Sequence, residues 1–296
     1  MTEKRLLCLG FGYAARRLAA TIGGQGWAVA GTVRDAGKTR ALEAADVNPV
    51  LWTESGLSEP ALSVADAILI STPPGDDGCP ALAAARGALL SREAPPEWIG
   101  YLSTNGVYGD YGGAWIDETS QLRAASPRAR RRIAAEMQWR ELGRAIGAQV
   151  VIFRLPGIYG PGRSALDTVR EGRAQRIFKP GQVFSRAHVD DIAAALRASI
   201  ADPGAGDLFN IADDEPAPPQ DVIAFACGLL GVEPPPLIPI EKADLSEMAR
   251  SFYADNKRVS NRLMKEKLLA RLSYPTYREG LRAILSEERS SKRIQD

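Results

Sequence analysis

The chain has 296 residues, 45% hydrophobic and 25% charged, which is long enough for a sizeable core and ordinary for a globular protein. Its formal net charge of +1 gives no global field that would favour a nucleic-acid or membrane partner. The chain has three scattered cysteines, which do not suggest a disulfide framework. It has one histidine, which argues against a histidine-based metal site and a Ser-His-Asp triad. We therefore predict no bound metal.

No run of about 18 apolar residues is present, so no membrane span is expected. The apolar run near the N-terminus is too short for a signal peptide. The sequence therefore predicts a cytoplasmic protein.

The segment from Leu6 to Leu18 passes from a short apolar run through a glycine turn into a helix-like stretch. Gly10, Gly12 and Ala15 occupy the small positions of the G-x-G-x-x-G/A fingerprint of a dinucleotide-binding βαβ unit. A pyrophosphate is expected at the start of the helix, where free N–H groups and the helix dipole favour an anion. We assign these three residues and Tyr13 to the cofactor; the alternative is a turn that serves packing alone.

A second strand is predicted at 26–34, and its end bears on the choice of cofactor. An acidic residue about 20 positions after the glycine turn favours NAD, whereas an arginine there accommodates the 2′-phosphate of NADP. Arg34 and Thr32 therefore favour NADP, and Asp35 favours NAD. The interpretation leans towards NADP, with a solvated Arg–Asp loop as the alternative.

Strands and helices alternate along the rest of the chain. Strands are expected at 49–52, 67–71, 98–103 and 149–154, and helices at 36–45, 81–91, 164–175, 189–201 and 220–230. This alternation predicts an α/β fold with a Rossmann-type, doubly wound parallel sheet. Ser71 and Thr72 are small residues at the end of the 67–71 strand, where the backbone is expected to pass beside a cofactor. We therefore assign both residues to the cofactor site.

Five further segments, in the right order, resemble the extended short-chain dehydrogenase/reductase superfamily of the NAD-dependent epimerase/dehydratase type. They are the V-Y-G segment at 102–109, D-E followed by S-P at 117–127, R-x-x-x-x-Y-G-P-G at 154–162, H-V-x-D-x-A at 188–193 and F-N-I at 209–211. Two later segments are similar to the family's closing motifs: 256–263, expected to be a helix, and 274–281.

The resemblance implies a smaller, interleaved C-terminal substrate lobe. Residues 1–155 and about 185–212 are expected to form the NAD(P)-binding Rossmann domain, and about 156–184 and 213–296 the lobe. The resemblance further assigns Pro156 and Gly157 to the cofactor, Arg186 to the substrate, and Ser103 or Thr104 to a hydrogen bond with a substrate oxygen.

The chain departs from the family at the catalytic Y-x-x-x-K motif. Alignment puts Arg128 at the tyrosine position and Arg132 at the lysine position, and no tyrosine lies between Tyr111 and Tyr159. Arg132 could replace the lysine as a ribose donor and fixed charge, but a guanidinium stays protonated and transfers no proton. Tyr108 is then the nearest candidate proton donor or substrate contact, although a structural role is the favoured interpretation. Arg128 and Arg132 share one helix face, which would suit an anionic substrate.

The sequence thus predicts an NAD(P)-binding protein of the epimerase/dehydratase type, an oxidoreductase or epimerase acting on a small polar or sugar-like substrate. The alternative is a non-catalytic NAD(P)-binding sensor or interaction module. A homodimer is compatible with the sequence.

Overall fold

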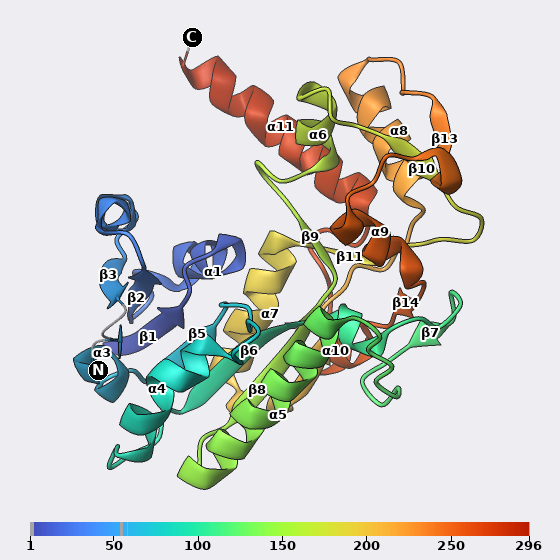
Figure 1. The fold of residues 1–296 in the computed structure, drawn as a ribbon. Helices are drawn as coiled ribbons and strands as arrows, with labels where there is room; N and C mark the ends of the chain where they lie inside the picture. The colour runs from blue at the N-terminus through green and yellow to red at the C-terminus, as the bar shows by residue number, and fades with distance from the viewer. Residues whose placement is uncertain (1–2, 54–55, 58, 296) are drawn as a thin grey trace.

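The structure, a computed structural model, describes residues 3–53, 56–57 and 59–295. Its centre is an eight-stranded sheet in which every neighbouring pair is parallel except β3 and β4 (Figure 1). In spatial order the strands are β12 (Leu208–Asn210), β8 (Val150–Leu155), β6 (Trp98–Thr104), β5 (Ala67–Ile70), β1 (Lys4–Leu9), β2 (Trp27–Val33), β3 (Asn48–Thr53) and β4 (Gly56–Leu57). The order reverses between β1 and β5, which is where open α/β sheets form their ligand crevice. The predicted doubly wound α/β fold is confirmed.

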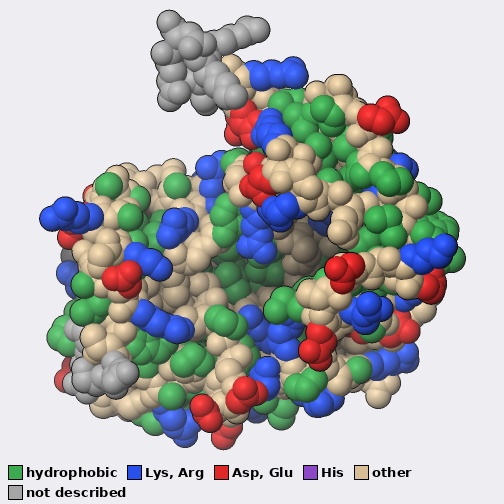
Figure 2. All heavy atoms as spheres, turned by 45° about the horizontal axis from the view of Figure 1, so that its top comes forward, with side chains coloured by type: hydrophobic (Ala, Val, Ile, Leu, Met, Phe, Trp, Pro, Cys, Tyr) green, Lys and Arg blue, Asp and Glu red, His purple; other side chains and the backbone are tan. Residues whose placement is uncertain are grey.

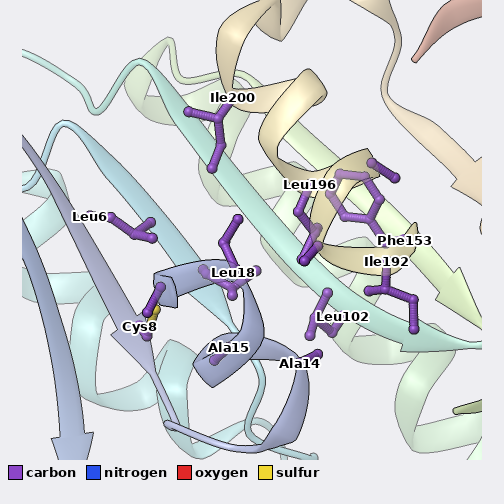
Figure 3. Close-up of a cluster of buried hydrophobic side chains, with 14 of the residues drawn as sticks. Leu6, Cys8, Ala14, Ala15, Leu18, Leu102, Phe153, Ile192, Leu196 and Ile200 are labelled. Carbon is purple, nitrogen blue, oxygen red and sulfur yellow. The ribbon is translucent and has the colours of Figure 1, made fainter. Parts of the chain in front are cut away.

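Helices cover both faces of the sheet because successive side chains of each strand point to opposite faces. In β1, Leu6 and Cys8 join one core cluster, whereas Leu7 and Leu9 join another. Figure 3 shows the first cluster, in which Leu18 of α1 lies near Leu196 of α7. The second cluster packs beneath α4 and α5. Burial on both faces explains why these strands are continuous apolar runs.

The α-helices are α1 (Tyr13–Ile22), α2 (Thr39–Glu43), α3 (Glu59–Ser63), α4 (Pro80–Leu90), α5 (Pro127–Ile146), α6 (Ala165–Arg170), α7 (Val189–Ala201), α8 (Pro219–Leu230), α9 (Glu247–Ala254), α10 (Arg262–Lys267) and α11 (Tyr277–Gln295). Short 3₁₀ turns lie at η1 (Ala36–Lys38), η2 (Asn105–Tyr108), η3 (Pro203–Ala205) and η4 (Ile240–Lys242). No helix in the described ranges is long and apolar enough to cross a membrane.

A smaller hydrophobic cluster lies among α6, α8 and α11, which stand together at the top of Figure 1, apart from the sheet. Its buried residues include Leu166, Val222 and Leu281. Three pairs of short parallel strands lie outside the central sheet. They are β9 (Gly157–Tyr159) with β11 (Arg186–His188), β10 (Arg176–Phe178) with β13 (Leu237–Pro239), and β7 (Trp115–Ile116) with β14 (Arg258–Val259).

Two expected helices differ from the structure. The helix predicted at 164–175 ends at Arg170, because Gly172 has a φ of +66° and turns the chain. The segment at 256–263 is not one helix: Arg258 and Val259 form β14, and α10 begins only at Arg262. The N–H of Arg258 donates to the carbonyl of Ala114, so pairing with a distant segment overrides the local pattern.

Candidate functional site

The glycine turn after β1 is held by β2 on one side and β5 on the other. Gly10 has a φ of +89°, and a Cβ there would lie 2.9 Å from the Ser71 hydroxyl oxygen. Its N–H donates to the Thr32 hydroxyl oxygen at 2.7 Å, and the Ser71 hydroxyl donates to its carbonyl at 2.6 Å. These contacts explain why glycine is needed here, and they fix the backbone path into α1.

Gly12, by contrast, faces open space. A Cβ at this residue would meet no atom within 4 Å, so packing does not account for a glycine here. The helix N-terminus beside it leaves free N–H groups, and Ala15, behind the turn, is fully buried against the sheet. The buried hydroxyl oxygen of Thr72, which follows β5, has no hydrogen-bond partner among the described residues. An open backbone, free N–H groups and an unpaired hydroxyl fit a dinucleotide at this turn.

The end of β2 carries the residues that bear on the choice between NAD and NADP. Arg34 is exposed, and Asp35 is partly committed, because one of its carboxylate oxygens accepts from the N–H of Gly37 and caps η1. Thr32 is only 5% exposed and lies beneath the glycine turn. Its oxygen accepts from Gly10, which leaves the hydroxyl hydrogen free to donate, so Thr32 as a phosphate contact stays a prediction.

Tyr13 connects the turn to the loop that follows β9. Its hydroxyl donates to the carbonyl of Pro161 at 3.0 Å, and the Arg163 guanidinium lies 5.7 Å from its ring centroid. Burial raises the pKa of the Tyr13 hydroxyl to about 12, so it stays protonated at neutral pH. The loop at 160–163 is thereby attached to the predicted cofactor turn.

The carboxyl end of β6 separates the two hydroxyl candidates. Ser103 is buried, and its hydroxyl donates to the carboxylate of Glu136. Thr104 is partly exposed, and its oxygen accepts from the N–H of Gly106, which leaves the hydroxyl hydrogen free to donate. The structure therefore argues against Ser103 as a substrate contact and leaves Thr104 as the candidate.

Tyr108 belongs to a buried polar network and not to an open site. It is fully buried; its hydroxyl accepts from Arg154 at 3.0 Å and donates to Asn210 at 2.9 Å. Arg154 also makes a buried ion pair with Glu136 of α5 at 2.7 Å. The hydroxyl donates and accepts inside the protein, which supports the favoured structural interpretation of Tyr108 over a catalytic or substrate-contacting one.

Arg128 and Arg132, which align with the tyrosine and the lysine of the family's Y-x-x-x-K motif, lie in the first turns of α5. The Arg132 guanidinium donates to the carbonyl of Leu102 at 2.6 Å, which fixes it against the end of β6. Arg128 is exposed, and its guanidinium lies 4.7 Å from the ring centroid of Phe252 in α9. Phe252 was not expected from the sequence, since nothing local indicates that α9 reaches α5.

Pro156 and Gly157 lie directly after β8, with Gly157 exposed and paired with Arg186 across the β9–β11 ribbon. A Cβ on Gly157 would lie 3.9 Å from the side chain of Arg186. Arg186 also lines a cavity of about 530 Å³ among α6, α8 and α11, which is in the usual size range of small-molecule sites. Figure 2 shows a hollow at the centre of one face with basic side chains around it.

The single histidine has a structural role. His188 is 2% exposed, and its Nδ1 accepts from the N–H of Asp190 at the start of α7. Its ring lies 3.9 Å from that of Tyr274. Burial lowers the pKa of His188 to about 4, so it is neutral at pH 7. No cluster of metal-ligating side chains occurs among the residues that the structure describes.

Comparison with known proteins agrees with this architecture. The NAD dependent epimerase/dehydratase family model matches residues 88–212. A solved structure of a functionally unknown conserved protein from Silicibacter pomeroyi is 47% identical, with a TM-score of 0.89, over 96% of this chain and 99% of that one. Protein YeeZ of Escherichia coli is 28% identical over 251 residues, 78% of this chain and 86% of its own.

The fold and the glycine turn define a Rossmann-type α/β protein. The segment 88–212 of this chain belongs to the NAD-dependent epimerase/dehydratase family. A structure of human epimerase family protein SDR39U1 with NADPH shares this fold, with a TM-score of 0.71 at 16% identity over 96% of this chain and 99% of that one.

Proposed function

We propose that this chain binds NAD(P) at the β1–α1 turn, with a preference for NADP. The observation that carries the proposal is Gly12, which is open on its outer side although nothing in the fold requires a glycine there. Family membership supports it, and the human family protein was solved with NADPH. Gly10, Tyr13 and Ala15 shape the turn, and Ser71, Thr72, Pro156 and Gly157 would border the cofactor further along the sheet edge.

Arg34 supports the preference for NADP. It is exposed at the end of β2, where a 2′-phosphate is expected, and a guanidinium binds phosphate through paired hydrogen bonds. Asp35, the residue that would favour NAD, is partly used as the cap of η1.

We further propose that the chain acts on a small polar substrate at the carboxyl edge of the sheet. A bound nicotinamide would supply the hydride acceptor or donor. Thr104 would donate a hydrogen bond to a substrate oxygen, and Arg132, fixed by the carbonyl of Leu102, would supply a permanent positive charge at the end of β6. Neither Arg128 nor Arg132 can move a proton, so proton transfer would use water or a substrate group. We propose that elements at 1–155 and about 185–212 form the cofactor domain and the rest the substrate lobe.

The second candidate function is a non-catalytic NAD(P) sensor. It is favoured by a specific observation: the position of the family's tyrosine is occupied by Arg128, and the neighbouring Tyr108 is buried and hydrogen-bonded internally. The two functions differ in whether any substrate produces steady-state hydride exchange.

Titration with NADPH and NADH, followed by fluorescence, tests the proposal. We expect NADPH to bind more tightly than NADH, and Arg34→Ala to weaken NADPH by about 10- to 100-fold, as expected for a lost charged hydrogen bond, without affecting NADH. Arg40→Ala, an exposed arginine on α2, is the matched control. Absence of binding of both nucleotides would overturn the proposal, and equal binding would overturn the preference for NADP.

A further inference from the structure

The cavity among α6, α8 and α11 is not explained by cofactor binding. Its volume is about 530 Å³, and the residues that matter here are Tyr159, Arg163, Arg173, Arg186, Val222 and Leu281. Neither Arg128 nor Arg132, the arginines expected to bind an anion, lines it. We refer to it below as the lobe cavity.

The acidic side chains that line the lobe cavity are already engaged. Asp167 accepts from the N–H and the hydroxyl of Ser164 in the capping box of α6. Glu171 is ion-paired with Arg173. Arg163 and Arg186 are in ion-pair contact with no carboxylate among the described residues. The side chains of the lobe cavity therefore leave an excess of positive charge.

The guanidinium of Arg186 is held in place by hydrogen bonds that use only some of its N–H groups. One terminal nitrogen donates to the carbonyls of Phe184 at 2.8 Å and Ala217 at 3.2 Å, which orients the plane of the guanidinium. A guanidinium keeps its charge even where burial lowers its pKa, as it does here. Asp213 lies close enough to interact electrostatically, but burial raises the pKa of its carboxyl to about 8, so at pH 7 it is largely protonated and neutralises little of this charge.

Apolar side chains line part of the lobe cavity, beside uncharged polar ones such as Thr168 and Gln175. Val222 of α8 and Leu281 of α11 belong to the smaller hydrophobic cluster and also line the cavity. Arg163 lies at the side nearest the glycine turn, because its guanidinium is over the ring of Tyr13. Arg186 lies beside Gly157, at the carboxyl edge of the sheet.

From this arrangement we infer that the lobe cavity binds a small organic acid. Its oxyanion, a carboxylate or a phosphate, is held by Arg186 with Arg163 at the entrance, and its apolar body packs on Val222 and Leu281. The inference rests on the proposed function only in making this acid the substrate, since the binding itself requires no cofactor.

Calorimetric titration of the full chain with phenylacetate, phenyl phosphate and the uncharged phenylacetamide tests the inference. We expect at least one of the two acids to bind saturably, and the amide to bind at least about tenfold more weakly. Arg186→Gln and Arg163→Gln each weaken the bound acid by about 10- to 100-fold and leave the amide unchanged. Arg170→Gln, on the outside of α6 and paired with Glu288, is the control and is expected to bind like the wild type.

Three results would overturn the inference: no saturable binding of either acid, equal binding of acid and amide, or unchanged acid affinity in both arginine variants. If Arg186→Gln does not fold, the exposed Arg163 keeps the test decisive. The relative affinities of phenylacetate and phenyl phosphate distinguish a carboxylate site from a phosphate site. An NADPH titration of the same sample separates the two proposals, because cofactor binding without acid binding contradicts only this one.

Discussion

Buried polar residues explain why several motifs of this family occur together in one chain. Tyr108 of the V-Y-G segment, Arg154 of the R-x-x-x-x-Y-G-P-G segment and Asn210 of the F-N-I segment meet in one hydrogen-bonded network. Glu136, on α5, pairs with the same arginine. A sequence motif at a strand end is therefore not by itself evidence of catalysis, because these side chains connect η2, β8, β12 and α5.

Removing one hydroxyl from this network tests its structural role. Tyr108→Phe leaves one N–H group of the buried Arg154 and the side-chain oxygen of Asn210 without their Tyr108 partner, so we expect the free energy of unfolding to fall by about 1–3 kcal/mol. Denaturant unfolding measures the change. The affinity for NADPH should stay within twofold of the wild type. Tyr111→Phe, whose hydroxyl bonds only to the carbonyl of Gln121, is the control and should cost less.

The single histidine gives a clean pH prediction. His188 has a pKa of about 4 in the folded chain because burial disfavours its charged form, against 6.5 for an unperturbed histidine. Between these values the unfolded chain binds a proton that the folded chain does not, so stability falls as the pH decreases through this window. The loss attributable to His188 is up to about 3 kcal/mol.

His188→Asn keeps a side-chain acceptor for the N–H of Asp190 but cannot be protonated. Denaturant unfolding between pH 7 and pH 4, compared in the two proteins, isolates the effect from other titrating carboxyls. The wild type should lose more stability than the variant on acidification. Parallel pH profiles would contradict the assigned pKa.

At the scale of secondary structure, the sequence predicted the central sheet well and the small strand pairs poorly. β5 is a continuous apolar run, as are the first four residues of β8, and this pattern is local. β7 and β14 have two residues each and exist only because they pair with each other across more than 140 positions of sequence. The lobe cavity depends on α6, α8 and α11 meeting, so Arg163 could not be recognised as part of a site from its own neighbourhood.

The glycine turn could be recognised from the sequence because the spacing of its small residues is the motif. Its two glycines should respond differently to substitution. Gly12→Val adds a side chain to open space at a residue with an ordinary φ of −86°, so we expect the free energy of unfolding to change by less than about 1 kcal/mol. The same side chain would occupy the position of the pyrophosphate, and the affinity for NADPH should fall on the order of 100-fold or more.

Gly10→Ala is the counterpart. Its positive φ and the nearby Ser71 hydroxyl predict a loss of more than about 1 kcal/mol in stability. Thermal unfolding and NADPH titration of both variants make the comparison. Unimpaired NADPH binding by Gly12→Val would contradict the placement of the cofactor at this turn.

For the whole molecule, the sheet provides most of the buried core, and the proposed cofactor would stabilise it by binding the folded state alone. At a free NADPH concentration of 100 times its Kd, the free energy of unfolding should rise by about 2.7 kcal/mol. A denaturation experiment with and without NADPH measures this increase. Arg34→Ala at the same NADPH concentration should show a smaller increase, while its stability without nucleotide stays at the wild-type value.

The course of the chain has a consequence for how such a protein can diversify. After β8 the chain enters the helical cluster at β9, returns to the sheet through β11 and α7, and leaves again after β12 for α8. The helical cluster is thus not one contiguous piece of the gene, and recombination cannot exchange it as a cassette. We therefore expect new specificity in this architecture to arise by point substitution in the lining of the cavity, or by insertions in connecting segments such as the one between α8 and α9.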